Sequence, residues 1–388
     1  MARRYKAIIN PELLVWARSS AGMDPEEAVR RLRKKRIKLD VSRLKSWETG
    51  AQAPTVAQLL KIAKVYRQSF AAFYLASPPA VFTPPTRDYR RPFGKEPRVI
   101  SPELAFEMRL SMERREICLE LLSRDGESPP FFDLTASVTE DPEQLGSRLR
   151  SFLGIEWERQ QRWRDSRIAL NAWRDQLEAK GVLVFQGTEV EPSDMRGFSI
   201  AQFPLPIIVV NRKDAYAGRV FSMIHELAHI VLQKSGLCDL DETSRIEVFC
   251  NRVAGSALVP RKLLLNEPLV KRTAGPYWDD GVLESLARMY SVSREVILRR
   301  LLTFGLTDSN FYETKREQYL REYGKRREST SRGFLDPVTD VKSAAGKRFI
   351  GLVLDALESG HIMAGDACEF LGVRSRHFDR LALEISLG

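Results

Sequence analysis

The chain has 388 residues, of which 43% are hydrophobic and 29% are charged, the composition of an ordinary globular protein. This length exceeds the size at which a single hydrophobic core keeps growing, so we expect two or three domains. No apolar run approaches the ~20 residues needed to span a bilayer, which predicts no membrane partner. The four cysteines lie far apart without a C-x-x-C pair, which indicates reduced thiols and a cytoplasmic location.

The net charge of +10 comes entirely from the first fifth of the chain. Residues 1–80 carry 16 Lys/Arg against 6 Asp/Glu, whereas the rest of the chain carries 45 of each sign. A basic segment of domain size is typical of proteins that bind nucleic acid or another polyanion. The alternative is a surface whose charge only keeps the protein in solution.

The first 80 residues have the periodicity and caps of five short helices. Asp24 is a plausible N-cap for the second helix, Asp40 for the third and Thr55 for the fourth, and Gly50 ends the third. Five short helices with a basic third helix predict a helix-turn-helix domain over residues 1–80.

The string LKSWETG at residues 44–50, with the following Pro54, Thr55 and Leu59, resembles the XRE-type repressor fold. The resemblance implies that the third helix enters the major groove of DNA at an operator-like site. XRE-type domains often act as dimers, so a homodimer is one expected state. The implied contacts to bases or phosphates are Ser42, Arg43, Lys45 and Ser46.

The connection RRLRKKRIKLD between the second and third helices is about five residues longer than the usual tight turn. The extra length would either add phosphate contacts or displace the reading helix and weaken sequence-specific binding. The candidate phosphate contacts in it are Arg33, Lys34, Lys35, Arg36 and Lys38.

The remaining chain divides into a linker, a long mixed segment and a helical end. A proline every few residues predicts a semi-extended linker over residues 81–100. Between residues 101 and 306, helical patterns surround three strand-like runs, VLVFQG, FSIAQF and IIVVN, and the PLP between the last two predicts an antiparallel pair. Residues 307–388 contain a charged helix and a small helical region. We therefore expect a mainly α fold with a small antiparallel β-sheet (α+β).

The stretch FSMIHELAHIVLQKSG contains the pattern H-E-x-x-H. On a helix, His225 and His229 lie one turn apart on the same face, so both imidazoles can reach a single metal ion. Glu226 points about 100° away from His225, close enough to hold a metal-bound water without being a ligand. Zinc lowers the pKa of that water, and Glu226 can take its proton as general base and later pass it to a leaving amine. This is the chemistry of metal-assisted amide hydrolysis.

A third protein ligand is required, and Glu247 in the run IEVFCNRVAGSALVP is the preferred candidate. Glu247 follows His229 by 18 residues and shares a mostly apolar helical face with Cys250 and Asn251. Cys250, one turn further on, is the alternative. Weaker candidates in the connecting loop are Cys238, Asp239 and Asp241. A His/His/carboxylate set binds zinc, and it binds manganese as well.

The string from Gly197 to Pro260 resembles the ImmA/IrrE family of bacterial metallopeptidases. The matching elements are GFS, HELAH and IEVFCNRVAGSALVP. The resemblance implies a gluzincin-like zinc site with His225, His229 and Glu247 as ligands and Glu226 as base. It also implies limited proteolysis of a repressor or antitoxin protein, which releases transcription of stress-response or mobile-element genes. An appended XRE domain is a known arrangement in this family.

Two further positions are candidates for supporting the site. Arg219 would steady the helix or polarise a substrate carbonyl, and Asn251 would hydrogen-bond to a ligand. The rival interpretation of the whole chain is a DNA-binding transcriptional regulator, or one half of a toxin–antitoxin pair, with a structural or inactive metal site. An intact Glu226 favours the enzyme, because a structural site needs no general base.

Overall fold

The structure is a computed structural model that describes residues 5–79, 101–163, 165–233, 240–273, 275–329 and 336–386. For residues 240–244 and 325–329 the description covers the backbone. The predicted linker 81–100 therefore lies outside the described residues, as do Cys238, Asp239 and the side chain of Asp241. The chain forms two compact units, residues 1–84 with 92–112 and residues 113–388 with 85–91.

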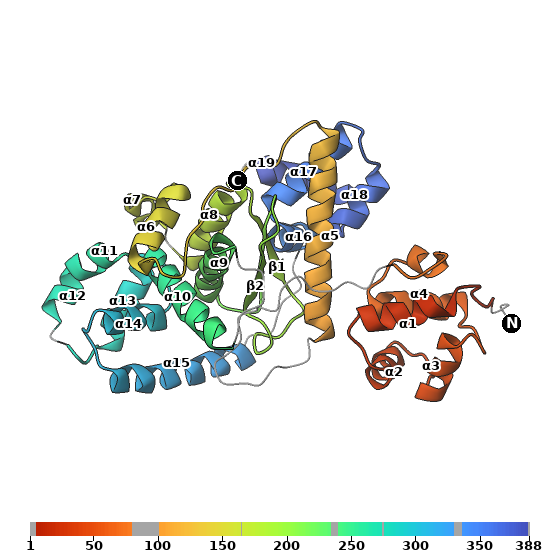
Figure 1. Ribbon diagram of the computed structural model, residues 1–388, viewed down its shortest axis with the longest axis horizontal. Helices are drawn as coiled ribbons and strands as arrows, with labels where there is room; N and C mark the ends of the chain where they lie inside the picture. The colour runs from red at the N-terminus through yellow and green to blue at the C-terminus, as the bar shows by residue number, and fades with distance from the viewer. Residues whose placement is uncertain are drawn as a thin grey trace. The chain divides into compact units, whose positions relative to one another are not determined.

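The N-terminal unit is helical (Figure 1). Its helices are α1 (Pro11–Ser20), α2 (Pro25–Lys34), α3 (Val41–Glu48), α4 (Val56–Tyr66) and the short 3-10 helix η1 (Ala71–Tyr74). The predicted caps are confirmed: the side chains of Asp24, Asp40 and Thr55 each accept a hydrogen bond from the third residue of the helix that follows. Trp47 of α3 is 1% exposed and belongs to the core of this unit.

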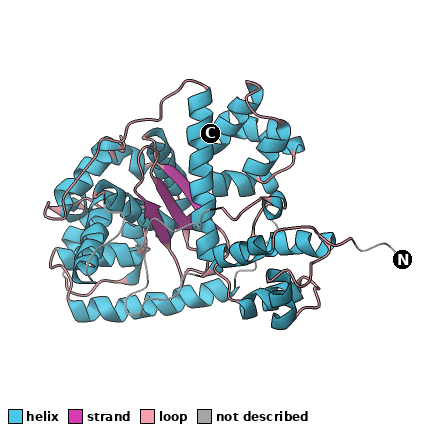
Figure 2. Ribbon diagram, turned by 45° about the vertical axis from the view of Figure 1, so that its right-hand side comes forward, coloured by secondary structure: helices cyan, strands magenta, loops and turns pink. Residues whose placement is uncertain are grey.

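The second unit consists of a small sheet enclosed by helices, and the boundary between the units falls within the long helix α5 (Pro102–Arg124). Figure 2 shows the strands surrounded by helices. The elements up to the last strand are α6 (Pro142–Phe152), α7 (Trp157–Gln161), α8 (Ser166–Ala179), β1 (Leu183–Gly187), β2 (Gly197–Ile200) and β3 (Ile207–Asn211). The helices that follow are α9 (Tyr216–Val231), α10 (Leu240–Leu258), α11 (Arg261–Asn266), α12 (Pro268–Arg272), α13 (Asp280–Tyr290), α14 (Arg294–Thr303) and α15 (Ser309–Ser329). The chain ends with α16 (Pro337–Ala345), α17 (Lys347–Glu358), α18 (Ala364–Leu371), the 3-10 helix η2 (Ser375–His377) and α19 (Phe378–Ser386).

The α+β class is confirmed, but the sheet is mixed. The strand order is β1-β3-β2. β2 and β3 form the predicted antiparallel pair, whereas β1 pairs with β3 in parallel. The chain passes from β1 to the far edge of the sheet, forms β2 there, and returns as β3 in the centre. The apolar runs predict strands but carry no information on their order, so the parallel pair was not expected.

All residues of the three strands are buried, because helices cover the sheet. α9 packs against β2 and β3, and α8 packs against α9 and β1. A continuous apolar core runs through α6 to α14 and includes Trp163 and Trp173. Among the described helices, none is long and apolar enough to cross a membrane.

The C-terminal helices are joined to this unit by a buried ion pair on α8. Arg174 Nε lies 2.9 Å from Glu178 Oε1, and both side chains are at least nine-tenths buried. Arg174 also donates to Ser343 O at the end of α16 (2.8 Å) and to Val184 O of β1. Glu178 Oε2 accepts from the backbone N–H of Arg348 at the start of α17 (3.1 Å). One pair thus supplies a donor to the end of α16 and an acceptor to the start of α17.

Gly346, between α16 and α17, has φ 84° and lies directly over this pair. A Cβ added there would overlap Glu178 Oε1 and lie 2.6 Å from Arg174 Nη2. We predict that Gly346→Ala lowers the free energy of unfolding of the second unit by about 2–4 kcal/mol. This is the cost of placing an alanine at a positive φ plus the cost of the overpacked contact. The measurement is urea denaturation followed by tryptophan fluorescence.

Gly351 in α17 is the matched control, because no neighbouring atom lies within 4 Å of an added Cβ and its φ is ordinary. Gly351→Ala should stabilise the unit by roughly 0.5–1 kcal/mol, as in any helix interior. Equal effects of the two substitutions would show that the ion pair does not hold the C-terminal helices in this position.

Candidate metal centre

The first turn of α9 is fastened to β1 by Arg219. Arg219 Nε donates to Asp214 O (2.8 Å) and Arg219 Nη1 donates to Gln186 Oε1 of β1 (2.9 Å). The guanidinium also lies over the Tyr216 ring, 4.3 Å from its centroid. Arg219 therefore connects the start of α9 to the sheet.

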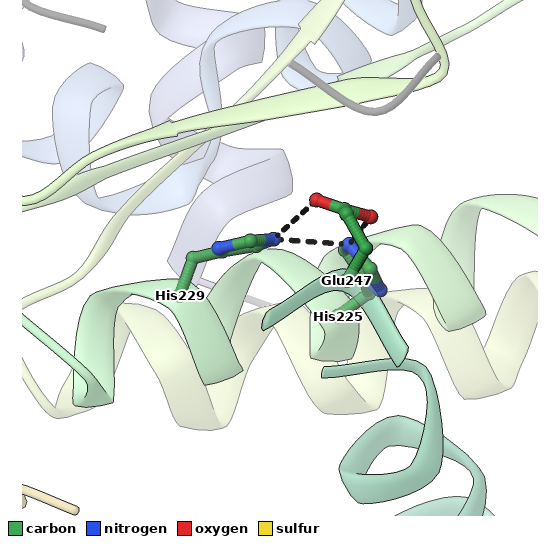
Figure 3. A group of neighbouring side chains, drawn as sticks. All are labelled: His225, His229 and Glu247. Carbon is green, nitrogen blue, oxygen red and sulfur yellow. Dashed lines mark hydrogen bonds and ion pairs between the residues drawn. The ribbon is translucent and has the colours of Figure 1, made fainter. Parts of the chain in front are cut away.

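The side chains of His225, His229 and Glu247 converge between α9 and α10 (Figure 3). The two Nε2 atoms lie 3.1 Å apart. Glu247 Oε1 is 3.1 Å from His229 Nε2, and Glu247 Oε2 is 3.3 Å from His225 Nε2. Two donors that are each about 2.0–2.1 Å from one tetrahedral zinc lie roughly 3.3 Å apart. The three groups thus have the spacing that a single divalent ion requires.

Burial and charge suit these groups to a cation. Burial alone would raise the pKa of the Glu247 carboxyl, but hydrogen bonds with His225 and His229 hold it well below its usual range. For His229, burial disfavours the charged imidazole, whereas Cys250 and Glu247 raise its pKa well above the ordinary value. The carboxylate is therefore ionised, as a ligand must be, and a proton on His229 has to leave before its imidazole can bind a metal.

Glu226 is buried beside the strand β2. It is 1% exposed, and its Oε2 accepts a hydrogen bond from Ser199 Oγ (2.9 Å). A Cβ added to Gly197, two residues earlier in β2, would lie 3.2 Å from Glu226 Oε1. The small residue at 197 and the hydroxyl at 199 let the strand approach the carboxylate closely and orient it.

Sequence reasoning did not assign a role to Ser199. The signal was present in the string GFS, because alternation along a strand puts Gly197 and Ser199 on the same face of β2. The sequence does not indicate that this face of β2 packs against α9, so the hydrogen bond from Ser199 to Glu226 could not be predicted.

Residues 177–302 match the family model of the IrrE N-terminal-like domain, Peptidase_M78. Among curated proteins, no match to the chain is found. The matched segment includes α9 and α10 with His225, Glu226, His229 and Glu247, and it supports a metallopeptidase-like domain of the ImmA/IrrE type. Residues 1–176 and 303–388 lie outside the match.

Within the IrrE-like segment, the position of Glu247 depends on how the far end of α10 is held. Its last carbonyls, which carry the negative end of the helix dipole, point at buried polar side chains. Arg150 Nη1 donates to Ala257 O (2.9 Å), Gln160 Nε2 donates to Leu258 O (3.0 Å), and Arg300 Nε donates to Val259 O (3.0 Å). Sequence reasoning missed these three residues, since on their own helices they look like ordinary polar positions.

Cys250 and Asn251 lie on α10 near His225, His229 and Glu247, and they differ in burial and contacts. The Cys250 thiol is buried and interacts with His229. Among the described residues, the group whose donor atoms lie within 4.8 Å of one another consists of His225, His229 and Glu247, without Cys250. Asn251 is half-buried on α10, and no hydrogen bond of its side chain to those three residues occurs in the described part of the chain.

The residues expected to contact DNA all lie on the N-terminal unit. Ser42, Arg43 and Lys45 are exposed on α3, and Ser46 is half-buried with its Oγ donating to Arg43 O (2.8 Å). The exposed basic residues at the end of α2 and in the connection to α3 are Arg33, Lys34, Lys35, Arg36 and Lys38.

Gln160 tests the anchoring of α10. Its amide donates to Leu258 O and to Tyr290 O (3.0 Å each), so Gln160→Ala would leave two buried carbonyls without a donor. We expect a loss of about 2–4 kcal/mol in the free energy of unfolding. Calorimetry of the full chain measures it. Gln161→Ala, at the exposed neighbouring position of α7, should have almost no effect, and a similar loss in both variants would contradict the anchoring role.

Proposed function

We propose that the protein is a metal-dependent endopeptidase that carries out limited proteolysis of a repressor or antitoxin protein, and that its basic N-terminal unit binds DNA. The observation that carries the proposal is the convergence of His225, His229 and Glu247, with Glu226 buried beside them, inside the segment that matches the IrrE-like peptidase model.

Two imidazole nitrogens and a carboxylate fit zinc, and they also accommodate manganese. His225 is fully buried, whereas the side chain of Glu247 is 23% exposed. A metal held here would therefore be reached by a substrate from the side of Glu247. Three protein donors leave a coordination position for a reactant, which is the arrangement of a catalytic rather than a structural zinc site.

The proton transfers would fall to Glu226. A bound divalent cation would polarise a substrate carbonyl and lower the pKa of a water molecule towards neutrality. Glu226, oriented by Ser199, takes a proton from the water and gives it to the leaving amine. A structural site would need no such buried carboxylate, and for this reason we prefer an enzyme to a regulator with an inactive metal site.

Strand β2 would be a platform for an extended peptide once its edge, whose residues are buried in this structure, is uncovered. It lies at one edge of the sheet in the order β1-β3-β2, and its Gly197 and Ser199 adjoin Glu226. A substrate that adds as a further strand to β2 would bring successive backbone carbonyls past the same carboxylate. Recognition by the backbone fits limited cleavage of an exposed loop in a folded partner.

DNA binding by the N-terminal unit would raise the rate at which the peptidase meets a DNA-bound substrate. The excess positive charge lies in residues 1–80, and α3 presents the exposed side chains of Ser42, Arg43 and Lys45. If both the enzyme and a repressor occupy neighbouring sites on DNA, cleavage occurs at a high effective concentration of the pair.

Metal content is the first prediction that follows. Protein purified without added metal should contain about one zinc or manganese ion per chain, because the three donors already have the spacing of ligands. Mass spectrometry of the metals should show the ion lost in Glu247→Ala and retained in Cys250→Ala. If the wild type contains no metal and takes up neither ion on titration, the peptidase proposal is contradicted.

Glu226→Gln should keep the metal but lower the cleavage rate by about 10²–10⁴-fold, the typical contribution of a general base. Ser199→Ala should also keep the metal and lower the rate by roughly tenfold, because the carboxylate loses one orienting hydrogen bond. The measurement is cleavage of a defined peptide library followed by mass spectrometry. The exposed Ser147→Ala is the control. Undiminished cleavage by Glu226→Gln would contradict the role of Glu226 as general base.

A further inference from the structure

An open concavity lies where α2 meets α3 in the N-terminal unit. Its lining residues are Arg33, Arg36, Ile37, Lys38, Leu39, Asp40 and Arg43. Four of these seven side chains are basic and one is acidic. The carboxylate of Asp40 is engaged as the N-cap of α3, where it accepts from the backbone N–H of Arg43 (2.7 Å). The concavity therefore presents mainly positive charge.

The backbone of this corner is regular and not a loose insertion. After α2 ends, the N–H of Arg36 bonds to Arg33 O (2.9 Å) and the N–H of Ile37 bonds to Leu32 O (3.2 Å). These two bonds form a Schellman motif. Ile37 and Leu39 are buried in the core of the unit, while Arg36 and Lys38 between and beside them are exposed. The connection is therefore held in place by its contacts with the core, and its charged side chains are exposed to solvent.

Arg36 occupies the one position of this motif where glycine is favoured. Its φ is 61°, in the left-handed region, where a side chain costs stability that glycine would not. The sequence nevertheless has a long basic side chain here. A conformationally unfavourable residue in a well-fixed turn points to a use for its side chain.

The basic side chains of the corner fall into two groups. Two of them hold the connection in shape: Arg33 Nε donates to Leu39 O (2.6 Å) and Arg43 Nη1 donates to Lys38 O (3.4 Å). In the described part of the chain, the other four form no hydrogen bond or ion pair through their side chains. These four are Lys34, Lys35, Arg36 and Lys38.

We infer that this corner binds a phosphodiester of the DNA backbone, with Arg36 as its principal contact and Lys38 beside it. The planar guanidinium of Arg36 suits two oxygens of one phosphate, and the ammonium of Lys38 adds a point charge. Such contacts position the protein without reading bases, so sequence discrimination stays with the exposed residues of α3. The inference rests on the DNA-binding part of the proposed function. It assigns the sequence-independent part of the affinity for DNA to the connection between α2 and α3.

DNA fits the corner better than a lipid surface does. A membrane-binding basic segment normally offers apolar side chains for insertion between the headgroups. The apolar residues of the connection, Ile37 and Leu39, are 3% and 4% exposed and face the core. The concavity also adjoins α3, whose exposed Ser42 and Lys45 would face the same ligand.

The test is Arg36→Gly in the full chain, because binding and stability should then change in opposite directions. Glycine suits φ 61°, so the melting temperature should be unchanged or higher. Binding to a labelled duplex of about 20 base pairs should weaken roughly eightfold at about 0.1 M salt. The reason is that losing one phosphate contact makes the negative slope of log K against log salt shallower by about 0.9. The loss should be equal for two duplexes of unrelated sequence.

Lys64→Ala is the control, since it removes one exposed charge from α4, outside the concavity. It should leave the salt slope unchanged. Lys38→Ala is a second variant, at a position whose φ is not positive. It should make the slope of log K against log salt shallower, as Arg36→Gly does.

Wild-type affinity and salt slope retained in both Arg36→Gly and Lys38→Ala would overturn the inference while leaving DNA binding itself intact. Failure of the wild-type chain to bind any duplex would instead remove the DNA-binding part of the proposed function, and the inference with it. Binding to phosphatidylserine vesicles without binding to the duplex would overturn the inference in favour of a lipid surface. None of these outcomes bears on the metal content of the second unit.

Discussion

The close packing of α10 against its neighbours is the constraint on which the candidate metal centre depends, because it brings Glu247 opposite His225 and His229. Gly146 of α6 allows this packing: a Cβ there would overlap Ser256 Oγ and lie 2.8 Å from Ala257 N. Arg150 and Arg300 then neutralise the end of α10, and Arg300 is itself paired with Glu143 through two hydrogen bonds (2.6 and 2.8 Å). Desolvation lowers the pKa of Arg150 to about 10, yet the side chain stays charged at neutral pH, so the carbonyls of α10 keep a cationic donor.

The parts of the site that follow from helix geometry could be predicted from the sequence. His225 and His229 are four residues apart, so any helix brings their imidazoles to the same side. The place of Glu247 on an inward-facing helical stripe makes it the preferred third ligand, and its carboxylate lies within hydrogen-bonding distance of both imidazoles. The helix caps Asp24, Asp40 and Thr55 were predictable for the same reason, since each cap acts within three residues of itself.

The parts that depend on contacts between distant segments could not be predicted. The parallel pairing of β1 with β3 depends on how the chain crosses the sheet, and a run of apolar residues is the same in either order. Ser199 and Glu226 are 27 residues apart, and Gln160 and Leu258 are 98 apart. Nothing in the local sequence distinguishes these polar residues from exposed ones. The left-handed conformation of Arg36 was hidden because glycine, the usual signal for it, is missing.

The two proposed activities depend on electrostatics of different range, and this has a consequence for how they can be combined in one chain. Residues 1–80 carry the whole excess charge, and most of their described basic side chains are exposed, where attraction to a polyanion is long-ranged but screened within about 10 Å at 0.1 M salt. The candidate metal centre is mostly buried, with both histidines at most 6% exposed and Glu247 23% exposed, and its attraction for a cation acts over a few ångströms, where salt screens less. Salt or a competing polyanion would therefore release the protein from DNA without disturbing the peptidase groups. Location and catalysis could in this way be regulated separately, since binding to a polyanion responds to salt much more than binding of a metal by mostly buried ligands does.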